Sequence, residues 1–192
     1  MSEGPGDKQG WFTIVAIVAV VLLGLAGWGA WYMADQRANA LPRQMRQIAT
    51  GFHTYAFDNK RFYPDHAAML LPSYLQEKFL THPFGPLPGH VATFTAPPTG
   101  PVYRLGDFIF PYMPGTKLGN SGAMLVISVA EEGSGVHLVA FDDGSVLRYN
   151  DDATFAAALD NDYKTRREPL GLQPITLKDI KSLERSSTGV AP

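Results

Sequence analysis

Charged residues make up only 18% of the 192-residue chain, the net charge is −2, and cysteine is absent. A nearly neutral chain gives no electrostatic reason to bind nucleic acid or another acidic polymer. Without cysteine, the protein has no disulfides, thiol nucleophiles or thiolate metal ligands. The length suits one modest domain with an appendage, which we expect to divide into residues 1–10, 11–33, 34–60, 61–166 and 167–192.

Residues 11–33, WFTIVAIVAVVLLGLAGWGAWYM, form a continuous apolar run without charge. A helix of this length covers roughly 34 Å, enough for a hydrocarbon core of about 30 Å. Trp11 at one end and Trp28, Trp31 and Tyr32 at the other are typical of interfacial aromatic anchors. A signal peptide is the alternative, but its apolar region is shorter, about 7–15 residues, and ends in small residues. We therefore predict a retained transmembrane helix.

The next segment, residues 34–60, is predicted to continue as an amphipathic helix. Apolar side chains recur there at steps of three and four, at Leu41, Met45, Ile48, Phe52 and Tyr55. Such spacing puts them on one helical face that can pack on a domain. Pro42 should kink or break the helix. The helix should end at about Asp58 to Lys60.

Residues 61–166 are expected to form a small α+β domain that begins with short elements. Asp65 is a candidate N-cap for a short helix over His66 to Leu71. Residues 83–101 hold many prolines and glycines, which predict an irregular loop.

Strand signals begin at Val102. Residues 102–113 suit a strand pair that turns at Gly106-Asp107, with Pro111 at a sheet edge. Residues 123–130 are a short apolar run suited to a central strand. The Asp142-Asp143-Gly144 segment lies between two further strand candidates and predicts a hairpin with a tight primed turn.

Two helices are expected after the hairpin. Asp151 or Asp152 can cap a short helix that runs to Leu159. In the tail, residues 167–192, Thr176 and Asp179 resemble a capping box, and an apolar stripe follows at Leu177, Ile180 and Leu183. Together the elements predict a long transmembrane-to-amphipathic helix packed on a small antiparallel sheet.

This order of elements resembles type IV pilins and type II secretion pseudopilins. Residues 11–27 resemble the prepilin stretch that starts with Phe-Thr, and residues 45–65 resemble the pilin segment where the helix ends in Asp-Asn and Tyr-Pro. Residues 139–159 resemble the Asp-Gly-Ser-Val hairpin of planctomycete pilin-like proteins. Two family features are missing. Ala16 or Val15 stands at the position of the prepilin glutamate, and Gly133 at that of a family histidine.

The resemblance implies a location as well as a fold. Pilin-like proteins keep the N-terminus in the cytoplasm of a bacterium and the domain outside the inner membrane. The positive-inside rule applied to Arg37, Arg43 and Arg46 favours the opposite orientation. We expect the orientation that the resemblance implies, because Arg43 and Arg46 lie on a helix that can pack on the domain.

Candidate chemistry is sparse, and we predict no catalytic, cofactor-binding or metal-binding residue. The five histidines form no metal-type pair. We expect His53 to be a surface or packing residue, His66 to be explained by the helix start at Asp65, and the remaining three, His82, His90 and His137, to be solvated. An acidic group around Asp142 and Asp151 fits turn and cap chemistry, with calcium as the alternative.

The functional hypothesis is a single-pass, pilin-like structural or assembly protein that is not an enzyme. Its expected partners are the lipid bilayer and other membrane-protein subunits, with no nucleic acid and no small-molecule substrate. An accessory single-span subunit of a larger membrane complex, without filaments, is the first alternative. A membrane-tethered periplasmic enzyme or ligand-binding module is the second.

Overall fold

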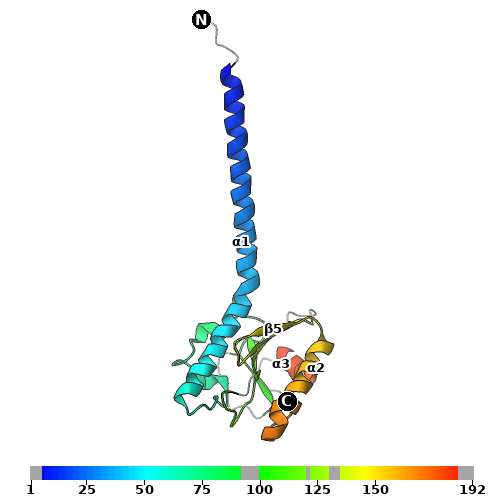
Figure 1. The fold of residues 1–192 in the computed structure, drawn as a ribbon. Coiled ribbons are helices and arrows are strands. Elements are labelled where there is room, and N and C mark those ends of the chain that lie inside the picture. Colours follow the sequence, from blue (N-terminus) through cyan, green and yellow to red (C-terminus); the bar gives the residue numbers. More distant parts are fainter. Residues whose placement is uncertain (1–5, 92–99, 120–121, 130–134, 186–192) are drawn as a thin grey trace. The chain divides into compact units, whose positions relative to one another are not determined.

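The computed structural model describes residues 6–91, 100–119, 122–129 and 135–185. Two compact units divide the chain, Met1–Ala40 and Leu41–Pro192. The architecture is α+β, with a long N-terminal helix whose second half packs against a five-stranded antiparallel sheet (Figure 1). This confirms the fold class expected from the sequence.

Helix α1 runs from Gly6 to Asp58. Its end confirms the predicted one, but the helix is unbroken at Pro42. The boundary between the two units falls just before this proline, between Ala40 and Leu41. The second half of α1 buries the side chains of Met45, Ile48, Ala49, Phe52 and Ala56. This face follows the helical spacing that the sequence predicted.

The chain leaves α1 through two residues in the left-handed region. The Arg61 N–H donates to the Ala56 carbonyl at 2.8 Å, which closes the last turn. Lys60 has φ +57° and Arg61 φ +68°. Glycine is the usual residue where a helix ends in this way, because any other side chain costs roughly 1–2 kcal/mol there. Lys60 and Arg61 therefore occupy a strained turn.

The five strands form a meander in the order β1-β2-β3-β4-β5, all antiparallel. Their bounds are Val102–Leu105, Phe108–Pro111, Met124–Ser128, His137–Phe141 and Val146–Tyr149. β3 lies at the centre of the sheet, as predicted. β2 pairs with both neighbours, so the prediction that Pro111 lies on an edge strand is wrong. Pro111 is tolerated because the pairing of β2 with β3 involves only Phe108 and Ile109.

The hairpin between β4 and β5 is confirmed, but its turn is not the predicted primed type. The Phe141 N–H donates to the Ser145 carbonyl at 2.9 Å, and the Gly144 N–H donates to the Phe141 carbonyl at 3.0 Å. Within this turn only Gly144 has a positive φ, at +80°. A primed type I′ turn would need two. The arrangement fits a three-residue turn with a glycine bulge.

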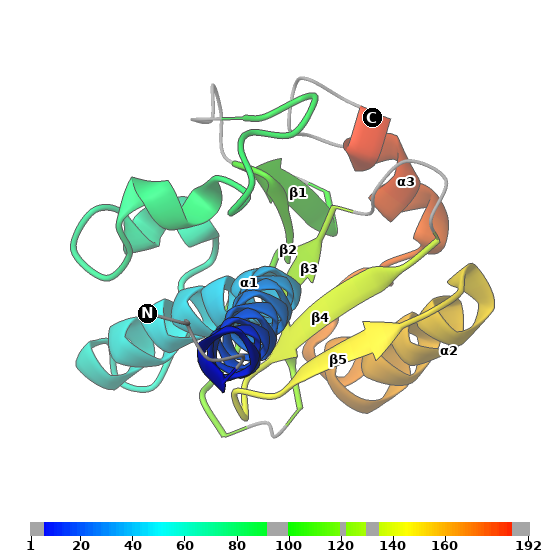
Figure 2. The same cartoon turned by 90° about the horizontal axis from the view of Figure 1, so that it is seen from above.

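Helices cover both faces of the sheet. The second half of α1 packs with Tyr103, Leu105 and Phe110 on one face. The other face carries Val102 and Ile109. It is covered by helices α2, Asp152–Asp162, and α3, Leu177–Arg185 (Figure 2). The side chains of β1 to β4 are almost all buried and alternate between two hydrophobic clusters, whereas β5 is a partly exposed edge strand.

Two of the three predicted helix caps are present in the structure. Asp151 caps α2 by accepting from the Thr154 N–H at 2.7 Å, as predicted. Thr176 and Asp179 form the predicted reciprocal pair before α3. The short helix expected after Asp65 is a 3-10 turn, Ala67–Leu70, and Asp65 does not cap it. A second 3-10 turn follows at Glu77–Leu80.

The segment expected to be a tail belongs to the domain. After α2 the chain makes a π-helical turn, Tyr163–Arg167, and a 3-10 turn, Glu168–Leu170. Ile175, Ile180 and Leu183 then enter the second hydrophobic cluster with at most 4% exposure. Removal of α3 would therefore uncover the part of this sheet face that α2 does not cover.

We expect Gly106→Ala to destabilise the domain by about 2–5 kcal/mol, because an alanine Cβ would meet the Leu80 carbonyl oxygen at 2.0 Å and would also adopt φ +62°. Gly144→Ala is the matched control, since its φ is +80° but no atom lies within 4 Å of the added Cβ. It should cost only about 1–2 kcal/mol. Urea unfolding of the detergent-solubilised chain measures both. Equal costs would contradict the close approach to Leu80.

Candidate functional site

The first unit presents an apolar helical surface. Among the described side chains between Trp11 and Met33, the large apolar ones are exposed, from 46% at Val15 to 73% at Leu23. Among the described residues this is the one helix long and apolar enough to cross a membrane. A signal sequence near the N-terminus would meet the same criteria. The helix is therefore compatible with membrane anchoring.

The apolar helix also contains three glycines with no close neighbours. An added Cβ at Gly24, Gly27 or Gly29 would meet nothing within 4 Å inside the chain. These glycines are therefore not required by packing within the protein. Small residues of this kind allow close helix approach in a bilayer.

A buried carboxylate, Asp107, organises the loop before β1. Its Oδ2 accepts from the His82 N–H at 2.8 Å, and its Oδ1 accepts from the Leu87 N–H at 3.1 Å. The His90 Nδ1 lies 3.0 Å from the same Oδ1. The His90 side chain is 29% exposed, so it is only partly solvated and has a protein partner that the sequence did not predict. Asp107 follows Gly106, so the sequence predicted only that it is part of a turn.

The fully buried Arg104 extends this polar network to α3. Its guanidinium donates to the carbonyls of Pro88 at 2.7 Å, Leu183 at 3.3 Å and Glu184 at 3.3 Å. Burial lowers the pKa of Arg104, which the nearby charges of Asp107 and Glu184 oppose. The donors are directed at main-chain oxygens, so this cluster fastens segments together and leaves no open position for a substrate.

His137 lies in a second polar cluster. Only 1% of its side chain is exposed, which contradicts the prediction that it faces solvent. Its ring stacks on Phe155 at 4.2 Å, its Nε2 lies 3.3 Å from Asp152 Oδ1, and its Nδ1 lies 3.9 Å from Glu184 Oε1. The Lys181 ammonium binds the other oxygen of Asp152. The two carboxylates lie against opposite ring nitrogens, so this geometry ties β4, α2 and α3 together.

Asp142 belongs to a third cluster at the hairpin. Its Oδ1 accepts from the backbone N–H groups of Gly122 and Ala123. Burial raises the pKa of Asp142, against the effect of these two bonds and of the Arg166 charge. The Arg166 guanidinium donates to the Gly122 carbonyl and to Asp162 Oδ1. Asp142 Oδ1 thus accepts hydrogen bonds from two backbone N–H groups. This arrangement does not favour the binding of a calcium ion by this oxygen.

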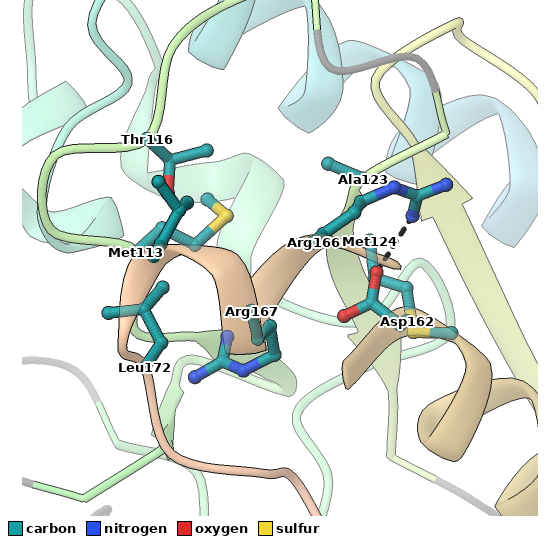
Figure 3. Close-up of a pocket in the computed structure, with 9 residues that line it drawn as sticks. Met113, Thr116, Ala123, Met124, Asp162, Arg166, Arg167 and Leu172 are labelled. Atoms are coloured by element: carbon teal, nitrogen blue, oxygen red, sulfur yellow. Dashed lines mark hydrogen bonds and ion pairs between the residues drawn. The ribbon is translucent and has the colours of Figure 1, made fainter. Parts of the chain in front are cut away.

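A small cavity adjoins this cluster (Figure 3). It is lined by Met113, Thr116, Ala123, Met124, Asp162, Arg166, Arg167, Leu170 and Leu172. Its volume of about 20 Å³ holds roughly one water molecule. Burial lowers the pKa of Arg167, whose Nε donates to the Gln173 carbonyl at 2.8 Å and whose Nη1 donates to the Tyr112 carbonyl at 3.3 Å. The cavity is too small for an organic substrate.

The other histidines do not converge on a common centre. His53 is half-buried, with its ring 6.2 Å from that of Tyr63, which confirms a packing position. His82 is half-buried against the ring of Phe84 at 5.5 Å. Within the described parts of the chain, no group of three or more histidine, aspartate or glutamate residues is placed to hold a metal ion. Glu131 and Glu132 lie outside the described residues.

No protein family, curated protein or solved structure matches the chain. A proposal about function therefore has to start from the polar clusters and the apolar helix described above.

We expect the stability of the domain to fall as pH rises through the titration of Asp142. Because burial raises its pKa above 3.8, the folded state binds the proton more tightly than the unfolded state does. The free energy of unfolding should therefore decrease between pH 3.8 and the raised pKa. Asp142→Asn should remove this slope in urea unfolding followed across acidic pH.

Asp143→Asn is the matched control one residue away. The pKa of the exposed Asp143 is lowered, chiefly by hydrogen bonds from Ser145, so its contribution has the opposite sign. The control should leave the slope due to Asp142 in place. An unchanged pH dependence in Asp142→Asn would contradict the assignment.

Proposed function

We propose that the protein is a single-pass membrane protein, anchored by residues 11–33, whose domain is presented to other membrane-protein subunits. One observation carries the proposal: the described large apolar side chains of α1 between Trp11 and Met33 are exposed, while the second unit has a core of its own. Exposed apolar surface of this extent in water would drive association or insertion.

A pilin-like structural or assembly role is the version that we favour. It is supported by the order of a long N-terminal helix followed by an antiparallel meander and by the sequence resemblances around residues 11–27, 45–65 and 139–159. The domain clusters described above fasten its own segments, as a structural role requires. An enzymatic role would need converging groups around a cavity larger than the one beside Arg167.

The alternative is an accessory subunit that uses this fold without forming filaments. One sequence observation favours it: Ala16 or Val15 replaces the prepilin glutamate. That glutamate is thought to neutralise the N-terminus of a neighbouring subunit during pilin assembly. A chain without it lacks this contact.

For orientation we propose a bacterial inner membrane, with the N-terminus in the cytoplasm and the domain in the periplasm. The resemblance supports this arrangement. The charges oppose it, because Arg37, Arg43 and Arg46 flank the domain side of the span, and all three side chains are exposed. The helix that carries Arg43 and Arg46 does pack on the domain, as expected, but the two side chains lie on its exposed face, so the proposed orientation depends on the resemblance.

We expect the native chain to stay in the membrane pellet after alkaline carbonate extraction. Val18→Arg with Leu22→Arg should release it, because each arginine at the centre of a span costs about 2.5–3.5 kcal/mol. Thr50→Arg with Thr54→Arg is the matched control, since these positions are exposed, one turn apart, on the second half of the same helix. Release of the native chain, or a mature N-terminus beyond residue 33 by intact mass, would contradict the anchor.

The absence of cysteine makes the orientation directly measurable, because any introduced cysteine is unique. A membrane-impermeant maleimide should label Ser73→Cys in intact spheroplasts, because Ser73 is exposed on the domain. Ser2→Cys should be labelled only after the membrane is permeabilised. The reverse pattern would place the domain in the cytoplasm, as the positive-inside rule favours.

A further inference from the structure

The end of α1, the turn after it and the segment bridged to this turn carry exposed cations and aromatic rings. We call it the basic turn, and it consists of Phe57, Lys60, Arg61, Phe62 and Lys117. All five side chains are exposed, Phe57 by 66% and Phe62 by 38%. Two phenylalanines this exposed within six residues are unusual for a surface that contacts only water.

The basic turn is held rigidly by main-chain contacts. Phe62 and Lys117 form an isolated antiparallel bridge. The Leu118 N–H donates to the Arg61 carbonyl at 2.7 Å, and the Tyr63 N–H donates to the Thr116 carbonyl at 2.9 Å. A surface fixed in this way loses little conformational entropy when a partner binds.

Backbone strain supports a role for these side chains beyond stability. Lys60 and Arg61 have φ values of +57° and +68°, where glycine would be less strained. Strained residues are kept at binding sites when their side chains are needed there. Cations near the C-terminal end of α1 also interact favourably with the helix dipole. This interaction does not explain why two aromatic rings are exposed there.

The charges of the basic turn are not neutralised within the described chain. None of the ion pairs found among the described residues includes Lys60, Arg61 or Lys117. The Lys117 ammonium lies 4.8 Å from the centre of the Phe62 ring, a cation–π contact that leaves the charge exposed. The nearest acid in sequence, Asp58, interacts with the Tyr74 hydroxyl.

We propose that the basic turn is a docking surface for an acidic segment of a partner protein that also supplies an apolar side chain. Carboxylates would meet the three cations, and the apolar side chain would cover the phenylalanine rings. The inference rests on the proposed function, in which the domain contacts other subunits, and it specifies the chemistry of one such contact.

The position of the basic turn and the charge of the chain favour a protein over a lipid surface or nucleic acid. The chain enters the domain at Leu41, and Arg61 comes after 17 further residues of helix, a rise of about 26 Å, so the turn lies at the other end of this helical segment. The net charge of −2 gives the whole chain no general attraction for polyanions.

The test uses the full chain in detergent micelles and a short fluorescent peptide of alternating glutamate and phenylalanine. Binding followed by fluorescence anisotropy should weaken as salt rises, because the contact is electrostatic. A peptide with glutamine in place of glutamate should bind much more weakly. No binding of the glutamate peptide would overturn the proposal.

Variants of the basic turn locate the binding. We expect the triple variant Lys60→Glu, Arg61→Glu and Lys117→Glu to lose affinity by about ten-fold or more. Phe57→Ala with Phe62→Ala should weaken binding several-fold without a change in charge. The control variant Lys78→Glu with Lys178→Glu changes two exposed lysines elsewhere on the domain and should bind normally. Equal losses in the control and the triple variant would refute the assignment.

Lys60→Gly separates docking from folding. It should raise the free energy of unfolding, because glycine relieves the strain at φ +57°, and it should weaken peptide binding, because one cation is lost. A destabilised variant with weaker binding would point to a structural role and overturn the docking role of Lys60.

A lipid occupant is tested in nanodiscs. An environment-sensitive dye on Phe57→Cys should give the same spectrum in phosphatidylcholine discs with or without phosphatidylserine. A blue shift with phosphatidylserine would identify lipid as the occupant and overturn the proposal. Peptide binding in micelles does not depend on whether residues 11–33 span a bilayer, so a failure here is distinct from a failure of carbonate extraction.

Discussion

The five-stranded sheet is apolar on both faces, and each face has to be covered. The second half of α1 covers one face, and α2 with α3 covers the other. Because both layers come from this chain, the second unit needs no partner to complete its core. The exposed apolar half of α1 is therefore not needed to complete this core, and its composition is compatible with a membrane environment.

A buried middle layer leaves little room for polar chemistry, and the polar groups inside the domain are used as fasteners. Arg104 and Asp107 bind the loop before β1 and the end of α3 to the sheet. His137 and Asp142 do the same for α2 and for the turn between β4 and β5. Such groups are costly to bury unless they are hydrogen-bonded, which explains why Arg104, Asp107 and Asp142 are directed at main-chain atoms.

Local sequence signals predicted much of the fold. The apolar spacing of Met45, Ile48 and Phe52 located the buried face of α1, and glycine chemistry located both tight turns. Long-range contacts were not predictable in this way. His137 was predicted to be solvated, because the residues around it in the sequence do not show that α2 and α3 cover its face of the sheet.

The candidate sites were less predictable than the fold, because their partners are distant in sequence. Asp107 bonds to groups 17 to 25 residues away, and Arg104 bonds to the chain 79 and 80 residues away. The basic turn was also missed, because the strain at Lys60 and Arg61 is a backbone property that their residue types do not reveal. Glycine is the residue that sequence patterns lead one to expect there.

Helix α3 has a consequence for the order in which the protein is made. Its residues Ile180 and Leu183 are synthesised after all five strands, yet they complete the core over β1 and β2. The apolar helix, in contrast, is synthesised before any strand of the sheet. A premature stop before Leu177 would therefore leave this face of the sheet with α2 as its remaining helix, and the core of the domain would stay incomplete.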